Sequence, residues 1–459
     1  MRSIVCLSLA GCTAAPAAEP SIDAPVITAT CDDTATIPIA GLTAHNTSAS
    51  PTYDRTHFGA NFGPSTWITQ AGATMPVDPD RFDMSLNPVT PGHVSAVDVH
   101  TLIPSRPDLK WFAHVVPWFH TPGGVNHIDI GVQSADADYV AAMLADMRRR
   151  GFDGLVINWY GKDSYTDQVT KLIQQQLAAT PDNHFTFILM LDKGIAGLSA
   201  TVLQQQIEYC KTKYFSDPNY EHEGAKPIVM FFGVTAVVGD AGMAQVKAAT
   251  GNAVWVTQGA NALASSWVDQ AFDWAHVWHD GVSATDPYNL GGVRGFYNAV
   301  KTSPKHVFGS MAGSFNGMLT KTVGWSKGKY LPTGDGECVV EWANTIDQVI
   351  SPNVTRMQWV TWNDWEEGSI IESGIENRVG IAAMLDGTML RWQLTGNEAT
   401  IDHYEVYAAT DGDQARMLAT VAAGSHELDI TGSCARELFV IAVGKPNIRD
   451  HASNRVAIP

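Results

Sequence analysis

The sequence has no dense cluster of basic residues. Its 459 residues include 29 lysines and arginines against 47 aspartates and glutamates, which gives a net charge of −18. The densest basic run, "MRRRG" at 147–151, is typical of the last turn of a helix, where cations complement the helix dipole. Binding to a phosphate backbone requires a basic surface, so the composition disfavours a nucleic-acid partner and suits a neutral substrate.

Motifs of several other chemistries are also missing. No glycine-rich phosphate loop follows an expected strand, and no Gly-x-Ser-x-Gly elbow supplies a serine nucleophile. The histidines form no HxxxH or HxH pair, and the cysteines form no CxxC pair. We therefore expect no metal and no cofactor. Cys210 lies in a helical pattern and is expected to be a buried thiol, while any disulfide pairing is left open.

The N-terminus has the pattern of an export signal. Arg2 precedes the short apolar stretch "IVCLSLA", and "LAGC" at 9–12 is similar to a bacterial lipobox. The similarity implies that residues 1–12 carry a lipoprotein-type signal and that Cys12 becomes lipid-anchored at the cell envelope. A plain signal peptide and secretion are the alternative. No later stretch is long enough for a transmembrane helix, so this anchor is the one membrane contact we expect.

The region between the signal and the main domain is irregular. Residues 13–50 are rich in Ala, Thr, Pro and Ser and are expected to form a tether. Residues 51–104 carry many Pro, Asp and Gly residues with little periodicity. We interpret them as an N-terminal extension of the main domain, which we assign to residues 51–382.

Short apolar runs alternate with helical patterns from about residue 108. The expected strands are 110–119, 152–161, 185–194, 226–233, 253–259, 274–281, 306–313 and 355–364. The expected helices are 134–151, 166–180, 199–215 and 337–351. This makes about eight βα units, the size of a (β/α)8 TIM barrel of the α/β class. An open doubly wound sheet is the alternative, which the missing phosphate loop disfavours.

The pattern changes after about residue 383 to short alternating strands without helices. These strands are 388–394, 402–409, 416–423, 426–432, 437–444 and 453–459. Trp392, Tyr404, Val406, "ELFVIAV" and the closing "SNRV" resemble a fibronectin type III domain. The resemblance implies a small all-β sandwich over residues 383–459 that serves as a spacer or a binding module.

The C-terminal ends of the expected barrel strands carry aromatic rings beside polar groups. In a (β/α)8 barrel these ends converge on one face, where the functional site is built. Rings stack on sugar faces, and carboxylates and amides bind hydroxyl groups. The pattern therefore predicts a carbohydrate-binding site. The candidate substrate-binding residues are Trp118, Asn158, Trp159, Tyr160, Asp192, Trp278, Asn363 and Trp365.

The last expected strand leads into "WVTWNDWEEGSIIE" at 359–372, in which Asp364 and Glu367 lie three residues apart. Cleavage of a glycosidic bond uses two carboxyl groups, one of which must hold a proton. A turn, or the first turn of a helix, would bring both acids to one site. The alternative is a solvated acidic loop in which Asp364 caps a helical turn.

The segment "WNDWEEG" resembles the signature of glycoside hydrolase families 71 and 99, which are endo-α-1,3-glucanases and endo-α-mannosidases or mannanases. The resemblance implies that Asn363, Asp364 and Glu367 belong to the site and that Glu366 is at a variable position. "GFDGLVINWYG" and "FTFILMLDKG" are similar to strands of family 71 and carry over Asn158 and Asp192. "HVVPWF" and "YFSDPNYEHEGAKPIVMFFG" are more similar to family 99.

The motif departs from both families. Family 99 has Glu where Asp364 stands and His where Glu366 stands, and family 71 has Tyr-Gly between its acids. The linkage, and the choice between inversion and retention with help from the sugar's 2-hydroxyl, are left open. We expect a monomeric endo-acting α-glycoside hydrolase in which Glu367 is the acid/base and Asp364 positions or activates the attacking group.

Two other interpretations of the chain's function are open. The first is a carbohydrate-binding surface lipoprotein that keeps the barrel without catalysis. The second is a structural cell-surface protein in which the barrel is only a scaffold.

Overall fold

A computed structural model describes most of the chain from residue 93 to residue 459. Outside the description are residues 120–132, 181–183, 274–284, 314, 317–329, 332–335, 365–366, 368, 410–413 and 434. Before residue 93 it describes the short strands β1 (Ile37–Pro38), β2 (Trp67–Ile68) and β3 (Thr74–Met75). The predictions for Cys12, the greater part of the tether, Trp278 and Trp365 therefore lie outside the described residues.

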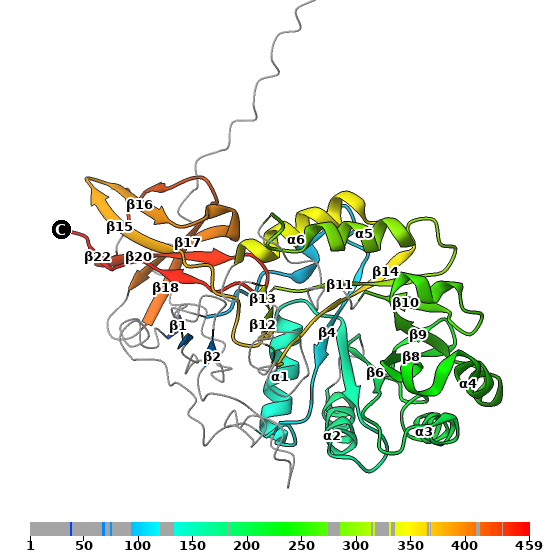
Figure 1. The fold of residues 1–459 in the computed structure, drawn as a ribbon. Coiled ribbons are helices and arrows are strands. Elements are labelled where there is room, and N and C mark those ends of the chain that lie inside the picture. Colours follow the sequence, from blue (N-terminus) through cyan, green and yellow to red (C-terminus); the bar gives the residue numbers. More distant parts are fainter. Residues whose placement is uncertain are drawn as a thin grey trace, which may run out of the picture.

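Eight parallel strands close into a barrel (Figure 1). They are β4 (Lys110–Val115), β5 (Gly154–Trp159), β6 (Thr186–Asp192), β8 (Lys226–Phe232), β9 (Val254–Gln258), β10 (Gln270–Phe272), β11 (Val307–Met311) and β14 (Val354–Trp359). The last strand pairs with the first, and Trp359 lies opposite Ala113. Because the sheet closes on itself, the barrel prediction is confirmed and the open doubly wound sheet is wrong.

Helices lie outside the barrel wall (Figure 1). They are α1 (Ala137–Arg149), α2 (Tyr165–Ala179), α3 (Ala200–Lys213), α4 (Val234–Thr250), α5 (Leu290–Val300) and α6 (Gly336–Val349). Asp136 begins α1, because its carboxylate accepts from the backbone N–H groups of Asp138 and Tyr139. Cys210 is a buried free thiol on α3, as expected. In the described part of the chain, no helix is both long and apolar enough to span a membrane.

The sixth barrel strand differs from the expectation. Its place between β9 and β11 is taken by β10, three residues long, which precedes the expected segment 274–281. Phe272 of β10 lies opposite Gln258 on one side and Phe308 on the other. The strand was missed because so short a run shows no periodicity.

The C-terminal part contains two antiparallel sheets. One has the order β15 (Gly380–Asp386), β16 (Met389–Thr395) and β19 (Glu427–Asp429). The other has β18 (Gln414–Ala422), β17 (Ile401–Ala409), β20 (Glu437–Gly444) and β21 (His451–Ala452), with β22 (Val456–Ala457) also paired to β20. Trp392 of the first sheet and Tyr404 of the second share one hydrophobic core. The all-β character is confirmed, while β15 was not among the expected strands.

Candidate active site

The ends of β5 and β6 bring two predicted polar residues together. Asn158 and Asp192 are both buried, and the Asn158 amide donates to Asp192 Oδ2 at 3.4 Å. The Gly194 backbone N–H donates to the other carboxylate oxygen at 2.6 Å. Burial raises the pKa of Asp192 above its ordinary value, although both hydrogen bonds act in the opposite direction. Asp192 therefore binds a proton more readily than an exposed aspartate does.

Asn363 fixes the chain where β14 ends. Its side-chain oxygen accepts from the backbone N–H of Val116 at 2.9 Å, just past the end of β4. The preceding backbone N–H, that of Trp362, donates to the His114 carbonyl at 2.7 Å. The segment beyond β14 is therefore anchored to the neighbouring strand, and the two acids follow directly from that anchor.

Asp364 and Glu367 lie in one turn. The Glu367 backbone N–H donates to Asp364 Oδ1 at 3.0 Å, and the Asp364 N–H donates to Thr361 Oγ1 at 3.0 Å. The two acidic residues are 6% and 8% exposed. Asp364 thus caps a turn, as the alternative interpretation expected, but the acids are buried rather than solvated.

Both acids belong to the loop of residues 361–372, which we call the acid loop. Hydrogen bonds join the two ends of this loop. The Thr361 N–H donates to the Ser369 carbonyl at 2.9 Å, and the hydroxyls of the same two residues are 2.7 Å apart. The Glu372 N–H donates to the Trp362 carbonyl at 2.9 Å. These bonds join the two ends of the loop, so the positions of Asp364 and Glu367 depend on how the base is held.

Trp118 and Tyr160 form a pair of parallel rings. Their centroids are 5.8 Å apart and the ring planes differ by 6°. A Cβ atom added at Gly194 would lie 3.1 Å from Tyr160 Cε1 and 3.1 Å from Asp192 Oδ1. The absence of a side chain at this position lets the Tyr160 ring lie close to Asp192. The structure thus places an aromatic surface beside the Asn158–Asp192 pair.

The Trp159 side chain points out of the barrel, toward helices α2 and α3. It is fully buried, its Nε1 donates to Asp167 Oδ1 at 3.2 Å, and its ring is nearly parallel to that of Tyr209. Asp167 lies on α2 and Tyr209 on α3, so the indole packs between the barrel wall and the helices. This placement contradicts the predicted contact with substrate. Successive residues of a strand face opposite sides, so an inward Asn158 requires an outward Trp159.

Sequence reasoning missed Gln358 and Ser310, two buried polar residues of the barrel strands. Gln358 Nε2 donates to Ser310 Oγ at 3.2 Å, and the Ser310 hydroxyl donates to the Asp273 carbonyl. Burial lowers the pKa of His114 to about 3, so its imidazole is neutral at pH 7. The signal that could have identified these residues is the presence of polar side chains at inward-facing positions of β4, β11 and β14. Within the described ranges, no group of three or more His, Cys, Asp and Glu residues could hold a metal ion.

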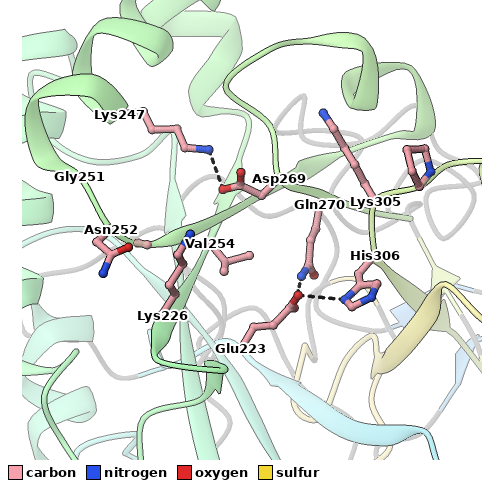
Figure 2. A pocket seen from close by; sticks show the side chains of 12 residues that line it. Glu223, Lys226, Lys247, Gly251, Asn252, Val254, Asp269, Gln270, Lys305 and His306 are labelled. Carbon is pink, nitrogen blue, oxygen red and sulfur yellow. Dashed lines mark hydrogen bonds and ion pairs between the residues drawn. The ribbon is translucent and has the colours of Figure 1, made fainter.

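The opposite end of the barrel contains a cavity of about 620 Å³ near the starts of β8, β9, β10 and β11 (Figure 2). Its polar lining is engaged in local contacts. Lys247 pairs with Asp269 at 2.6 Å, and Glu223 accepts from Gln270 and lies 2.9 Å from His306 Nδ1. None of the predicted site residues lines this cavity.

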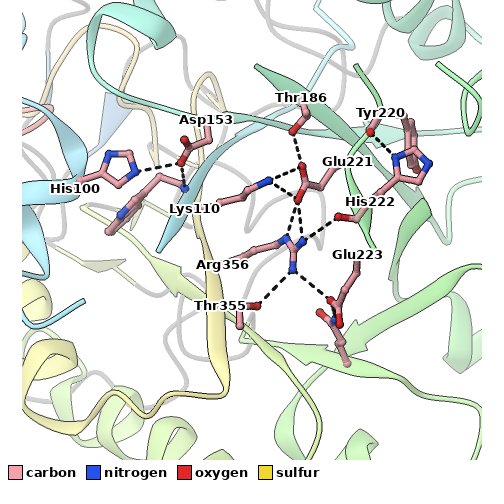
Figure 3. A network of polar contacts seen from close by, with 12 residues as sticks. His100, Lys110, Asp153, Thr186, Tyr220, Glu221, His222, Glu223, Thr355 and Arg356 are labelled. Carbon is pink, nitrogen blue, oxygen red and sulfur yellow. Dashed lines mark hydrogen bonds and ion pairs between the residues drawn. The ribbon is translucent and has the colours of Figure 1, made fainter. Parts of the chain in front are cut away.

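Buried ion pairs lie at the same end (Figure 3). Glu221 accepts from Lys110 Nζ at 3.0 Å, from Arg356 Nη2 at 2.8 Å and from the Thr186 hydroxyl at 2.8 Å. Arg356 also donates to Glu223 at 3.3 Å. Glu221 is thus neutralised by two cations, as expected of a group that stabilises the fold.

No protein-family model and no curated protein matches the chain. Among solved structures it is similar to the GH99 endo-α-mannosidase from Bacteroides thetaiotaomicron, with 13% identity, a TM-score of 0.46 and coverage of 57% of this chain and 87% of that one. A glycoside hydrolase-like protein has 13% identity, a TM-score of 0.47 and coverage of 58% and 87%. A glycoside hydrolase has 11% identity, a TM-score of 0.36 and coverage of 72% and 92%. Similarity at this level assigns no activity.

Proposed function

We propose that the protein is an endo-acting glycoside hydrolase that cleaves α-linked polysaccharide of the α-1,3-glucan or α-mannan type. The observation that carries this proposal is the buried pair Asp364 and Glu367 in one turn, beyond the C-terminal end of the last barrel strand. This is the end of a (β/α)8 barrel at which catalytic groups are found. The choice of α-linked glucan or mannan rests on the resemblance of "WNDWEEG" to families 71 and 99.

The two acids have different roles in this proposal. Glu367 donates a proton to the glycosidic oxygen as the bond from that oxygen to the anomeric carbon breaks. In the inverting course, Asp364 takes a proton from the water that attacks the anomeric carbon. In the retaining course, Asp364 takes the proton of the sugar's 2-hydroxyl, whose oxygen attacks that carbon and closes a three-membered ring. Water then opens the ring at the anomeric carbon, giving its proton to Glu367, while the 2-oxygen takes back the proton held by Asp364. Both courses use the same two residues.

Substrate contacts follow from the neighbouring strand ends. Asn158 and Asp192 are placed to bind sugar hydroxyls, and the parallel rings of Trp118 and Tyr160 form an aromatic border beside them. The proposed site also includes Trp278 and Trp365, which lie outside the described residues. We leave Trp159 out of it. Asn363 supports the site by anchoring the acid loop rather than by binding hydroxyls through its oxygen.

The remaining parts of the chain fit an extracellular enzyme. The similarity of "LAGC" to a lipobox supports export and a lipid anchor at Cys12, with plain secretion as the alternative. The strand order β15–β16–β19 facing β18–β17–β20–β21 supports a fibronectin type III-like sandwich. We expect a monomer in which this sandwich is a spacer or a binding module.

The test is incubation of the purified protein with α-1,3-glucan, yeast-type α-mannan and other α-glucans. Oligosaccharides of several lengths should appear as new reducing ends, because an endo-acting enzyme cuts within the chain. A protein with both Asp364→Asn and Glu367→Gln is the control for contaminating hydrolases. Binding of a polysaccharide without cleavage would contradict the proposal and favour the carbohydrate-binding lipoprotein. Neither binding nor cleavage would favour the scaffold interpretation.

A further inference from the structure

The base of the acid loop is contacted by a buried arginine from a distant part of the chain. Arg150 follows the last residue of α1 and is almost completely inaccessible to solvent. We propose that Arg150 is a positioning residue, which fixes the acid loop and thereby the geometry of Asp364 and Glu367. The inference rests on the proposed function for its catalytic consequence, and its structural part can be tested separately.

One guanidinium group contacts both ends of the acid loop. Its Nη1 donates to the Ile371 carbonyl at 2.6 Å, and its Nη2 donates to the Glu372 carbonyl at 2.8 Å. The guanidinium carbon also lies 4.7 Å from the centre of the Trp362 ring. Trp362 directly precedes Asn363 and the acids, while Ile371 and Glu372 end the loop. A shift of Arg150 would therefore move both ends together.

The arginine itself has a fixed position. Its Nη2 also forms an ion pair with Asp146, one turn earlier on α1. Burial lowers the pKa of Arg150, and the adjacent Asp146 carboxylate opposes that effect, so the guanidinium remains charged. A buried charge that loses a hydrogen-bond partner is destabilised, which confines the planar group to this one arrangement.

A second contact joins α1 to the end of the loop. The Tyr139 hydroxyl donates to the Glu372 carboxylate at 2.7 Å. Glu372 is thus bound by α1 through its side chain as well as through its carbonyl. Glu372 therefore has a structural partner on α1 and is not part of the proposed catalytic pair.

The C-terminal sandwich contacts the same arginine. The Asn447 side-chain oxygen accepts from Arg150 Nη1 at 3.4 Å, and the Asn447 carbonyl accepts from the Ile375 N–H at 2.8 Å. The barrel helix, the acid loop and the sandwich therefore meet at one guanidinium group. The sandwich supports the proposed site in addition to any role as a spacer.

The neighbouring arginine provides a matched control. Arg149 also pairs with Asp146, at 2.6 Å, but its Nη atoms donate to the Val94 carbonyl. It has the same charge at the same end of α1 without a hydrogen bond to the acid loop. Arg150→Lys and Arg149→Lys therefore make equivalent chemical changes, and the first of them removes the bidentate contact with the loop.

The experiment compares kcat, KM and the pH profile of kcat/KM for the wild type and both lysine variants, at equal folded fraction. Arg150→Lys should lower kcat by about 10- to 100-fold with KM within about twofold, because misplaced catalytic groups slow chemistry more than binding. It should also shift the acidic limb of the pH profile. Arg149→Lys should leave all three unchanged. Equal losses in both variants, or no loss in either, would overturn the inference.

Two further measurements test the positioning role of Arg150 if Arg150→Lys does not fold or if the wild type is inactive. If Arg150→Lys does not fold, Tyr139→Phe removes a single hydroxyl and should lower kcat about threefold or more through the loss of one hydrogen bond to Glu372. If the wild type cleaves no polysaccharide, the proposed function fails, and hydrogen exchange then tests the loop alone. Peptides that contain the amides of Glu367, Ser369 and Ile371 should exchange faster in Arg150→Lys than in Arg149→Lys. Equal exchange would overturn the positioning role.

Discussion

The two ends of the barrel hold buried carboxylates in different ways. At the N-terminal end, Glu221 accepts from Lys110 and Arg356, so its charge is balanced by two cations (Figure 3). At the C-terminal end, Asp192 accepts from a backbone N–H and from the Asn158 amide. It forms no ion pair with any residue in the described part of the chain. Glu221 is thus bound by two cations, whereas Asp192 is bound by two neutral hydrogen-bond donors with the Lys193 charge nearby.

This difference has a chemical consequence. The charge of Glu221 is matched by Lys110 and Arg356, as expected of a group that holds the fold together. Burial raises the pKa of Asp192, although the hydrogen bonds from Gly194 and Asn158 and the Lys193 charge act in the opposite direction. The acids that line the cavity at the N-terminal end, Glu223 and Asp269, are engaged in ion pairs, which favours the C-terminal end as the place of the proposed site. Four substitutions test this contrast.

The largest effect is expected for Asp364→Asn. It should lower kcat by about 100- to 10,000-fold, because a group that activates the nucleophile or takes its proton is lost. The asparagine side-chain oxygen can still accept from the Glu367 N–H, so the unfolding free energy should change by less than about 1 kcal/mol. Initial rates and urea denaturation measure the two quantities. Glu366→Gln, at the variable position of the motif, is the control and should retain most of the activity.

Glu221→Gln should show the opposite behaviour. It should lower the unfolding free energy by about 3–5 kcal/mol, because Lys110 and Arg356 lose their common buried anion. The rate per folded molecule should not change. Glu208 pairs with Lys211 at 2.8 Å on the surface of α3, and Glu208→Gln should cost less than about 1 kcal/mol. Equal costs at the two positions, measured by urea denaturation, would contradict the structural role of Glu221.

Asp192→Asn should change how stability depends on pH. The folded-state pKa of Asp192 is raised, so the unfolded chain ionises first as the pH increases. The wild type should therefore lose stability relative to Asp192→Asn as the pH rises above about 4, the ordinary pKa of an aspartate. Urea denaturation of both proteins across this range tests the sign. A difference that grows in favour of the wild type with rising pH would mean that Asp192 is stabilised as an anion.

The smallest effect is expected at His100, beside the N-terminal end of the barrel (Figure 3). A hydrogen bond with Asp153, supported by Asp98, raises the pKa of His100 to about 9. The stabilisation is fully present below the unfolded pKa of about 6.5 and is lost as the pH rises through about 9. After allowance for partial solvent exposure, His100→Gln should cost about 1 kcal/mol at pH 6 and less at pH 9.5. An equal cost at both pH values would exclude the charged pair as its source.

Much of the fold could be predicted because its signals are local. The barrel strands appear as short apolar runs between helices, and the strand ends identify Asn158 and Asp192, which the structure brings into contact. Trp159 was misplaced because two adjacent residues of one strand were both assigned to the site, although they face opposite sides of the strand. Helices α4 and α5 were missed because glycines interrupt their patterns, including Gly239 with φ of 74°.

The supports of the candidate site could not be predicted. Arg150 contacts Ile371 and Asn447, which are 221 and 297 residues further along the chain. No spacing rule connects such positions, because their proximity depends on closure of the barrel and on docking of the sandwich. The motif gave the candidate acids, but the structure was needed to find what holds them.

The most direct test of the account is the rate of polysaccharide cleavage by Glu367→Gln, measured alongside its binding of the same substrate. The account predicts that the rate per folded molecule falls by about 100- to 10,000-fold, since the proton for the leaving oxygen is lost. Binding should stay within about threefold of the wild type, because the aromatic border and the Asn158–Asp192 pair are unchanged. Cleavage by Glu367→Gln at the wild-type rate would contradict the central claim that the acid loop carries the catalytic acid.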